Sequence, residues 1–482
     1  MWSQLLKIKT IFIKKTINWL VVLFFIALFG LGLVYFFKPA VLALGFFILL
    51  IVFWRYTEVS FLVLVAYLPF QLALNLAPDI DLLSGRLLIL MLFLVWLAKQ
   101  WLFNKEKIFN LFKNQNVIAL LFFLLMALVS VFWAQNQIWA SRKILVFISV
   151  FPLFFLTSAF IDNWSKAKRL IFIIISSAAF SAIIALTQFL LQFVFGRQEI
   201  FSFWAKNIVP YFSGASFAQL VLNNPSWLVE SGGQVFLRAI GLFPDPHMLA
   251  FYLGLALPFC LVMFVFEKKY RWWLLIAFCL LFTVLLLTFS RGGYLGVLGG
   301  LLVVFLAVWP QIRNKERKFI VSVFLMGVVC LAFFGGSVTG RFFSSFNLSE
   351  GSNLGRLQIW QNSWEIFKEK PIGGVGLGNY SLALNFAQDY RNPVTSHNLY
   401  FDILVELGVF GLLIWLWLFG SAIKISWQNR KSIPVLAVGS LGSLVYFLTH
   451  SFFETAIFNP TVLAFLMIIL GLANFSKPKD VY

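Results

Sequence analysis

The sequence predicts an all-α, polytopic integral membrane protein, and three observations support that prediction. Of its 482 residues, 61% are hydrophobic and 11% are charged, whereas soluble domains have about 25% charged residues. Apolar runs of about 20 residues, the length that spans a bilayer as a helix, recur from end to end of the chain. Lysines and arginines gather in alternate connections between these runs. A soluble globular fold is therefore excluded.

Fourteen apolar runs are predicted to form helices, and the shortest of them, 40–54, is predicted to be tilted or partly buried. The first run is too long for the core of a signal peptide and lacks a small-residue cleavage site, so we expect a membrane anchor there. No repeat and no linker interrupts the chain, which predicts one membrane domain over residues 1–482. The predicted helices are 17–37, 40–54, 59–77, 86–103, 117–133, 144–160, 170–195, 247–266, 272–289, 292–309, 319–336, 399–423, 433–450 and 459–474.

The distribution of basic residues predicts the orientation. Of the 37 lysines and arginines, 24 fall in one set of alternate connections and 13 in the other, and the richer set is expected in the cytoplasm. Eight of the 13 lie in two long loops, 196–246 and 337–398, where this rule has least force. Both termini are thus predicted to be cytoplasmic and both loops extracytoplasmic. The net charge of +19 reports orientation and predicts no nucleic-acid partner.

No metal or cofactor site is predicted. The three cysteines have neither zinc-site nor disulfide spacing, since all lie in apolar runs. Asp79 and Asp81, in the first outer loop, resemble the paired carboxylates that bind metal in many sugar-transferring enzymes. Pro78 supports the competing interpretation, an ordinary turn or helix cap.

Two candidate residues flank predicted helix starts. Asp245 is predicted to cap the helix that begins near His247. His247 is then either a helix-start histidine at the interface or a substrate contact at the outer mouth. Arg291 lies in a short turn between two apolar helices, where an arginine can extend to lipid headgroups or hold a lipid-linked phosphate.

The second long loop contains a predicted amphipathic helix, capped by Asn353 and ended by Pro371. Arg356 falls in its first turn, where free amide groups favour an anion and a guanidinium can bind phosphate through two hydrogen bonds. The alternative is an ion pair with Glu350. The apolar residues that define the helix recur at helical spacing, namely Leu357, Trp360, Trp364 and Phe367.

Beyond this helix, the glycine-rich run 373–378 is predicted to form a tight turn or, at most, a backbone cradle for phosphate. His397, followed by Asn398, comes directly before the helix 399–423. A histidine at this boundary can accept a proton from a hydroxyl group. His450 and Glu454, four residues apart, are interpreted as structural or supporting residues.

Four of these segments together resemble the O-antigen ligase/polymerase superfamily of membrane glycosyltransferases, over residues 240–470. They are SRGG around Arg291, GRLQIW around Arg356, PIGGVGLGNY from Pro371, and the H-N-x-x-F-x6-G pattern from His397 to Gly408. In the last pattern Phe401 stands where leucine is usual, and asparagine is commoner at the position of His247. The resemblance implies a fold like that of type-C glycosyltransferases with about twelve helices, so a count of 12–14 is expected.

The resemblance also implies an activity: inverting, metal-independent transfer of a glycan from a polyprenyl-diphosphate donor, such as undecaprenyl diphosphate, to an acceptor glycan or lipid. It implies that Arg291 and Arg356 bind the diphosphate and that His397 acts on the acceptor. We further expect Asn398 to orient His397. Ligase and polymerase remain open alternatives.

A transporter or flippase of a polysaccharide or lipid-linked glycan is the competing class. Transporters place ionisable groups near the midplane, whereas the candidate polar groups here cluster at the predicted outer mouth. The main polar residues within the predicted helices are Gln188, Gln192 and Glu406.

Overall fold

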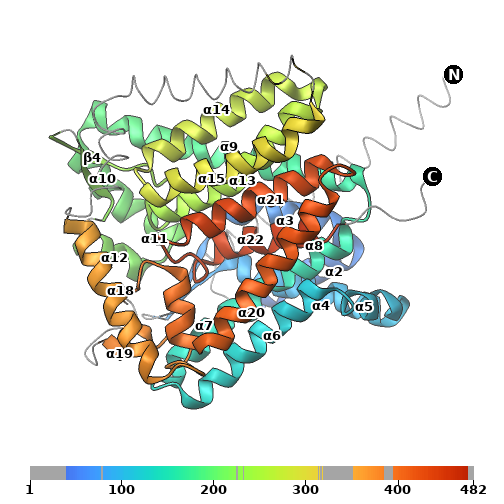
Figure 1. The fold of residues 1–482 in the computed structure, drawn as a ribbon, viewed down its shortest axis with the longest axis horizontal. Helices are drawn as coiled ribbons and strands as arrows, with labels where there is room; N and C mark the ends of the chain where they lie inside the picture. Colours follow the sequence, from blue (N-terminus) through green and yellow to red (C-terminus); the bar gives the residue numbers. More distant parts are fainter. Residues whose placement is uncertain are drawn as a thin grey trace.

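Apolar helices form most of the molecule, because a helix satisfies its own backbone groups where water is absent. The structure is a computed structural model that describes residues 39–77, 80–223, 226–231, 233–312, 314, 317, 351–384 and 394–475 (Figure 1). Within these residues, eight helical segments are long and apolar enough to cross a membrane: Ser84–Phe103, Gln115–Trp133, Gln137–Phe160, Trp164–Phe195, Pro246–Phe266, Lys268–Leu287, Arg291–Gln311 and Leu399–Asn429.

The protein is therefore an all-helical polytopic membrane protein, its described residues contain eight or nine candidate spans, and fourteen spans are not confirmed. The ninth would be a pair of helical segments, Leu44–Arg55 and Thr57–Phe70, between which the chain bends by 116°. Two helices expected to span the membrane are short: α21 (Pro434–His450) and α22 (Pro460–Ala473). The predicted helices 17–37 and 319–336 lie outside the described residues.

The helix predicted over 59–77 is wrong in its second half. Helix α3 (Thr57–Tyr67) gives way to a short 3-10 turn, Leu68–Phe70, and then to a strand. Pro69, in that turn, has no backbone N–H to continue the helical hydrogen bonds. Strand β1 (Ala73–Ala77) pairs antiparallel with β2 (Ile80–Leu83).

The first long loop has its own folded structure. Its short helices surround a small apolar core that includes Trp204 and the fully buried Trp227. Gln188 and Gln192, on the long helix α9 (Trp164–Phe195), bind the loop's backbone: Gln188 Oε1 accepts from Ile240 N at 2.9 Å and Gln192 Oε1 from Leu237 N at 2.8 Å. These glutamines therefore serve to attach the loop to α9. The loop elements are α10 (Arg197–Asn207), α11 (Val209–Phe212), α12 (Ala215–Asn223), β3 (Leu228–Ser231) and β4 (Gln234–Leu237).

The centre of the bundle is α13 (Pro246–Phe266), which is buried over almost its whole length. Glycines allow its neighbours to approach closely: a Cβ at Gly254 of α13 would lie 1.9 Å from the ring of Tyr446 on α21. The other helices and short helical turns are α2 (Pro39–Arg55), α4 (Ser84–Phe103), α5 (Lys105–Leu111), α6 (Gln115–Val129), η2 (Ser130–Trp133), α7 (Gln137–Val150), α8 (Pro152–Phe160), α9 (Trp164–Phe195), η3 (Lys268–Tyr270), α14 (Arg271–Leu287), α15 (Arg291–Val308), η4 (Trp309–Gln311), α18 (Gly351–Glu369), α19 (Tyr380–Leu384) and α20 (Leu399–Asn429).

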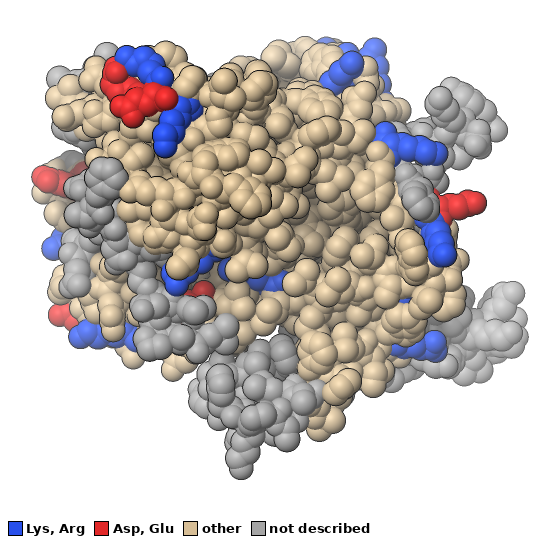
Figure 2. Space-filling view, turned by 90° about the horizontal axis from the view of Figure 1, so that it is seen from below, with Lys and Arg blue, Asp and Glu red and all other residues tan. Residues whose placement is uncertain are grey.

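Charged side chains gather toward two opposite edges of the face in Figure 2, and the surface between them is mostly apolar. A small group of charged atoms also lies in a hollow on this face. In Figure 1, α10, α12 and α18 lie at one side of the molecule and α5 at the other. This arrangement is what a helix bundle with two polar ends and an apolar middle requires.

The glycine-rich run forms a tight turn that packs on a kink in α20. At the kink, Gly408 has φ 70°, and a Cβ there would lie 2.0 Å from the carbonyl oxygen of Ile372. Val375 N donates to Val405 O at 2.9 Å, and Gly376 N donates to Glu406 O at 3.0 Å. These amides are therefore committed to the kinked helix, which supports the turn interpretation rather than a phosphate cradle.

Candidate active site

The ends of four helices, α13, α15, α20 and α21, meet at one end of the bundle and hold all the predicted site residues except Arg356, which lies on α18. Helix α20 begins beside the end of α21, where Leu399 N donates to Ser451 O at 2.9 Å. Helix α15 begins beside the same segment: a Cβ on Gly292 would lie 2.6 Å from the His450 ring and 2.8 Å from Phe453 Cβ. Helix α13 joins them through hydrogen bonds described below. The structure thus brings together segments that are far apart in the sequence.

His397 forms an ion pair with Glu454, which lies in the turn after α21. Its Nδ1 is 3.1 Å and 3.2 Å from the two carboxylate oxygens. The charge of Glu454 and its hydrogen bond raise the pKa of His397 above the ordinary 6.5, while burial and the charge of Arg356 oppose that shift. Burial raises the pKa of Glu454, but the charge and hydrogen bond of His397 outweigh it and hold that pKa well below its ordinary value.

The His397 backbone is strained, with φ 50°, a region that costs a residue with a side chain about 1–3 kcal/mol. Its neighbours hold it there. Asn398 is the N-cap of α20, since its side chain accepts from Tyr400 N at 3.0 Å and Phe401 N at 3.2 Å. Asn398 is thus positioned to support the histidine by fixing the start of the helix.

His450 is held in one tautomer by its neighbours on α21 and α13. The Tyr446 hydroxyl donates to Ala250 O at 2.6 Å, so it must accept from His450 Nδ1, 3.1 Å away. The other nitrogen, Nε2, then accepts from the Ser290 hydroxyl at 3.1 Å. The His450 ring is fully buried and stacks on Phe251 at 3.7 Å, which favours the neutral imidazole.

The same hydrogen-bond chain continues to His247. Because the Ser290 hydroxyl donates to His450, its oxygen accepts from His247 Nδ1 at 3.0 Å. His247 Nε2 then faces Arg238 Nη2 at 3.4 Å, a group that can only donate. Both nitrogens of His247 are therefore engaged, which favours the structural interpretation over a substrate contact. Asp245 caps α13 as predicted, accepting from His247 N at 2.8 Å.

Of the three histidines in the sequence, His397 is the one suited to act as a base. Its side chain is 43% exposed, and within the described part of the chain its Nε2 has no hydrogen-bond partner. With Glu454 accepting from Nδ1–H, the neutral ring carries its lone pair on Nε2.

Arg291 is the first residue of α15. It follows Ser290, the serine that links His247 and His450 by hydrogen bonds and that also caps α15 by accepting from Gly293 N at 3.2 Å. Arg291 is only 5% exposed. An arginine that extends to headgroups would be more exposed, so the structure favours a role inside the helix cluster.

Arg356 lies on α18 close enough to His397 to lower its pKa. One turn further on, Trp360 anchors α18 to this site: its Nε1 donates to Ser396 O at 3.0 Å, and its ring lies 6.0 Å from that of Phe401. A helix is present where the amphipathic helix is expected, but Leu357 and Trp364 of its predicted apolar face are exposed, and Asn353 lies within α18 rather than at its cap. The alternative partner, Glu350, is outside the described residues.

Sequence reasoning missed the role of Glu454. Its spacing from His450 suggested one helix face, but α21 ends at His450 and the chain turns before reaching Glu454. An available signal was that Glu454 is the one charged residue between α21 and α22. Arg238, buried and bonded to Thr288 O at 2.7 Å, was also not singled out.

The structure offers no support for a metal role of the aspartate pair. Asp79 lies outside the described residues, and Asp81 lies in β2 with its side chain against Gly214. Over the described ranges, no three His, Cys, Asp or Glu side chains are grouped to hold a metal ion.

Comparison with known proteins finds a similarity over part of the chain. Residues 276–416 match the family model described as O-antigen ligase. Over this region, which is about 29% of the 482 residues, the chain is similar to the O-antigen ligase family. The matched region of this chain contains Arg291, Arg356, His397 and the kink at Gly408, whereas His247 and Glu454 lie outside it.

Three curated relatives are similar to this chain. An O-antigen polymerase of Salmonella muenchen is 28% identical over 186 residues, covering 37% of this chain and 44% of that protein. The teichuronic acid biosynthesis protein TuaE of Bacillus subtilis (strain 168) is 25% identical, covering 39% of this chain and 41% of that protein. An O-antigen ligase of Pseudomonas aeruginosa is 25% identical, covering 34% of this chain and 37% of that protein. The chain thus spans less than half the length of each.

Proposed function

We propose that this protein is a membrane glycosyltransferase of the O-antigen ligase or polymerase type. It moves a glycan from a polyprenyl-diphosphate donor to an acceptor hydroxyl on the outer face of the cytoplasmic membrane. The observation that carries the proposal is the His397–Glu454 pair. Arg356 lies close enough to this pair for its charge to lower the pKa of His397. The family match and the curated relatives support the substrate class.

In the proposed reaction, the acceptor oxygen attacks the anomeric carbon of the donor sugar while the bond from that carbon to the diphosphate breaks. The acceptor proton passes to Nε2 of His397, and the electron pair of the broken bond leaves with the diphosphate. A single displacement of this kind inverts the anomeric centre. It requires a base and a cationic site for the leaving group, with no cofactor or metal.

Glu454 makes His397 a competent base in two ways. It holds the proton on Nδ1, which leaves the lone pair on Nε2 toward solvent. It also stabilises the imidazolium that forms when the proton arrives, as a carboxylate does beside any catalytic histidine.

Arg291 and Arg356 are proposed to bind the diphosphate. A planar guanidinium can make two parallel hydrogen bonds to a phosphate, and such groups stabilise the charge that develops on the leaving oxygen. Arg291 is fixed at the helix start by the Ser290 hydrogen-bond chain, and Arg356 is carried by a helix that is anchored next to His397.

The test is transfer by the purified protein in proteoliposomes from a polyprenyl-diphosphate glycan, with EDTA present. Wild type should form product. Arg291→Lys and Arg356→Lys keep the positive charge but lose the planar guanidinium, so each should lower turnover at least ~10-fold. Alanine at either position should lower turnover by a factor of about 10²–10³.

Arg197→Lys is the matched control, because Arg197 is exposed and donates to Val235 O within the first long loop. It should retain wild-type turnover. Absence of transfer by wild type with every donor and acceptor tried, or dependence on an added divalent metal, would contradict the proposal. Product on a glycan acceptor would indicate a polymerase, and product on a lipid-linked core acceptor would indicate a ligase.

A further inference from the structure

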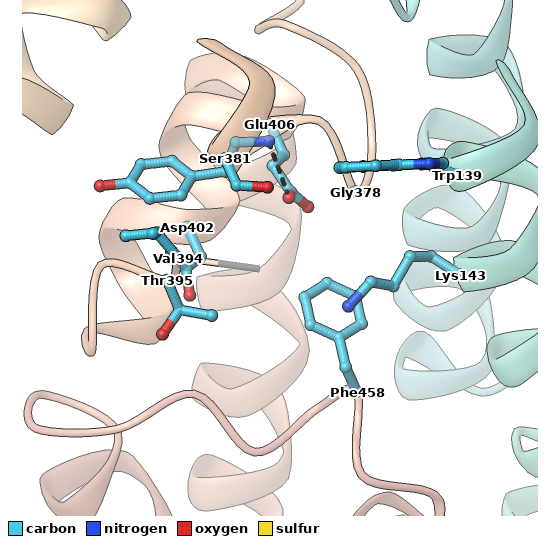
Figure 3. A pocket seen from close by; sticks show the side chains of 10 residues that line it. Trp139, Lys143, Gly378, Ser381, Val394, Thr395, Asp402, Glu406 and Phe458 are labelled. Atoms are coloured by element: carbon cyan, nitrogen blue, oxygen red, sulfur yellow. Dashed lines mark hydrogen bonds between the residues drawn. The ribbon is translucent and has the colours of Figure 1, made fainter. Parts of the chain in front are cut away.

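A small cavity beside His397 contains charged groups that the proposed reaction does not use. Its volume is about 30 Å³, and it is lined by three charged residues, three aromatic rings and four smaller residues. Lys143 comes from α7, and Asp402 and Glu406 from the first turns of α20 (Figure 3). The full set is Trp139, Lys143, Gly378, Tyr380, Ser381, Val394, Thr395, Asp402, Glu406 and Phe458.

The charges face one another across the cavity instead of touching. Among the described residues no ion pair within 4.0 Å joins Lys143 to either carboxylate; its ammonium lies 3.5 Å from the centre of the Phe458 ring. Figure 3 shows Lys143 extending over that ring, with Glu406 opposite. A network that served only to stabilise the fold would gain most from direct contact between the opposite charges.

The cavity is tied to the catalytic pair on both sides by one carboxylate. Asp402 Oδ1 accepts from the backbone N of Ser396 at 3.0 Å, the residue before His397. Its other oxygen accepts from the hydroxyl of Thr455, the residue after Glu454. Thr395 lines the cavity two residues before His397, so their Cα atoms are at most about 7 Å apart.

The size and lining of the cavity indicate what it holds. One water needs about 10–15 Å³ of such space, so about 30 Å³ accommodates two waters or one exocyclic group of a sugar, rather than a whole ring. The lining combines aromatic surface with a few polar groups, as ligand pockets do. Carboxylates accept hydrogen bonds from the hydroxyl groups of a ligand, and an ammonium group donates hydrogen bonds to the oxygens of those hydroxyl groups. Trp139, Lys143 and Phe458 are only half-buried, which gives the cavity an opening.

We propose that this cavity is an acceptor subsite, which takes a hydroxyl-bearing exocyclic group of the acceptor sugar and so aims a neighbouring hydroxyl at His397. The inference rests on the proposed function, because it assigns the acceptor to one side of that site. Two carboxylates face one ammonium here, so a neutral sugar is favoured over one whose exocyclic group is a carboxylate.

The experiment is saturation-transfer NMR on the full chain in nanodiscs, with glucose and glucuronate as separate probes. Wild type should transfer saturation to glucose, with a smaller signal for glucuronate. The double variant Lys143→Met/Glu406→Gln removes one charge of each sign and should reduce the glucose signal to that of empty nanodiscs. The matched control, Lys424→Met/Glu199→Gln, changes the same residue types at exposed positions and should bind as wild type does.

A second variant keeps the buried charges intact. Thr395→Trp places a bulky side chain at the half-buried rim and should also abolish the glucose signal. A wild-type signal no larger than that of empty nanodiscs, undiminished glucose binding in Thr395→Trp, or stronger binding of glucuronate would overturn the inference. Because sugar binding is read without turnover, this failure is distinct from failure of the proposed transfer reaction.

Discussion

At the scale of single residues, the three histidines show how neighbours set a side chain's chemistry. His247 and His450 have both ring nitrogens engaged in one directed chain, whereas His397 has a carboxylate on one nitrogen and an exposed side chain. The sequence singled out His397 through its place before a helix, and the cap at Asp245 was predicted and is confirmed. The pairing of His397 with Glu454 was beyond sequence reasoning, because the two lie 57 residues apart and no local pattern links them.

The pH dependence of transfer tests that pair. His397 must be neutral to accept a proton, and Glu454 raises its pKa above 6.5, so wild-type kcat/KM should rise with pH through an apparent pKa above that value. In Glu454→Gln the two largest effects that raise the pKa are lost, and burial and Arg356, which lower it, are opposed only by the smaller effect of Asp402, so the acid limb should move to lower pH. The maximum should also fall, by about 10²-fold, because the imidazolium loses its counter-charge.

The measurement is kcat/KM from about pH 5 to pH 9, across the range in which histidine titrates. Glu365→Gln, an exposed carboxylate on α18, is the control and should leave the profile unchanged. An acid limb that stays in place in Glu454→Gln would show that His397 is not the titrating base.

At the scale of elements, most apolar helices were predictable and their bends were not. Helix α13 begins at Pro246, against a prediction of 247, and α20 begins at 399 as predicted. The bend between α2 and α3 and the strand pair that follows were missed, because an apolar run has the same composition whether it is straight or broken. The kink in α20 depends on Gly408, whose role appears only once the glycine turn is seen packed against it.

Gly408→Ala should therefore disrupt the site. Its backbone, φ 70° and ψ −172°, is essentially restricted to glycine, and the added Cβ would meet the Ile372 carbonyl. We expect a loss of at least about 2 kcal/mol of stability and loss of transfer, measured by thermal unfolding in detergent and by product formation.

Gly420→Ala, on the same helix, is the matched control, because a Cβ there meets no atom within 4 Å. Alanine favours a helix by up to about 1 kcal/mol over glycine, so this variant should be as stable as wild type or slightly more so. Equal behaviour of the two variants would contradict the assigned role of the kink.

At the scale of the whole molecule, composition and charge predicted a polytopic helical membrane protein, and the structure confirms that class, with eight or nine candidate spans in the part of the chain that it describes. The convergence of four helix ends depends on long-range packing, which hydropathy does not encode. The orientation in the membrane remains a prediction from the basic residues.

Single cysteines test that orientation, in a background from which the three native cysteines are removed. Lys368→Cys on α18 and Lys105→Cys on α5 are both at exposed positions, on connections predicted to be outside and inside respectively. A membrane-impermeant thiol reagent should label the first in intact cells and the second only after permeabilisation. The reverse pattern would place His397 and both arginines on the cytoplasmic side.

The central claim, that His397 accepts the proton of the acceptor hydroxyl, is tested most directly by measuring product formation and donor binding separately in reconstituted His397→Ala and His397→Gln. The rate of product formation should fall by a factor of about 10²–10⁴ in both variants, because neither side chain accepts a proton at neutral pH. Binding of the polyprenyl-diphosphate donor should stay near wild type. Near-wild-type product from folded His397→Ala would contradict the claim, as would loss of donor binding equal to the loss of rate.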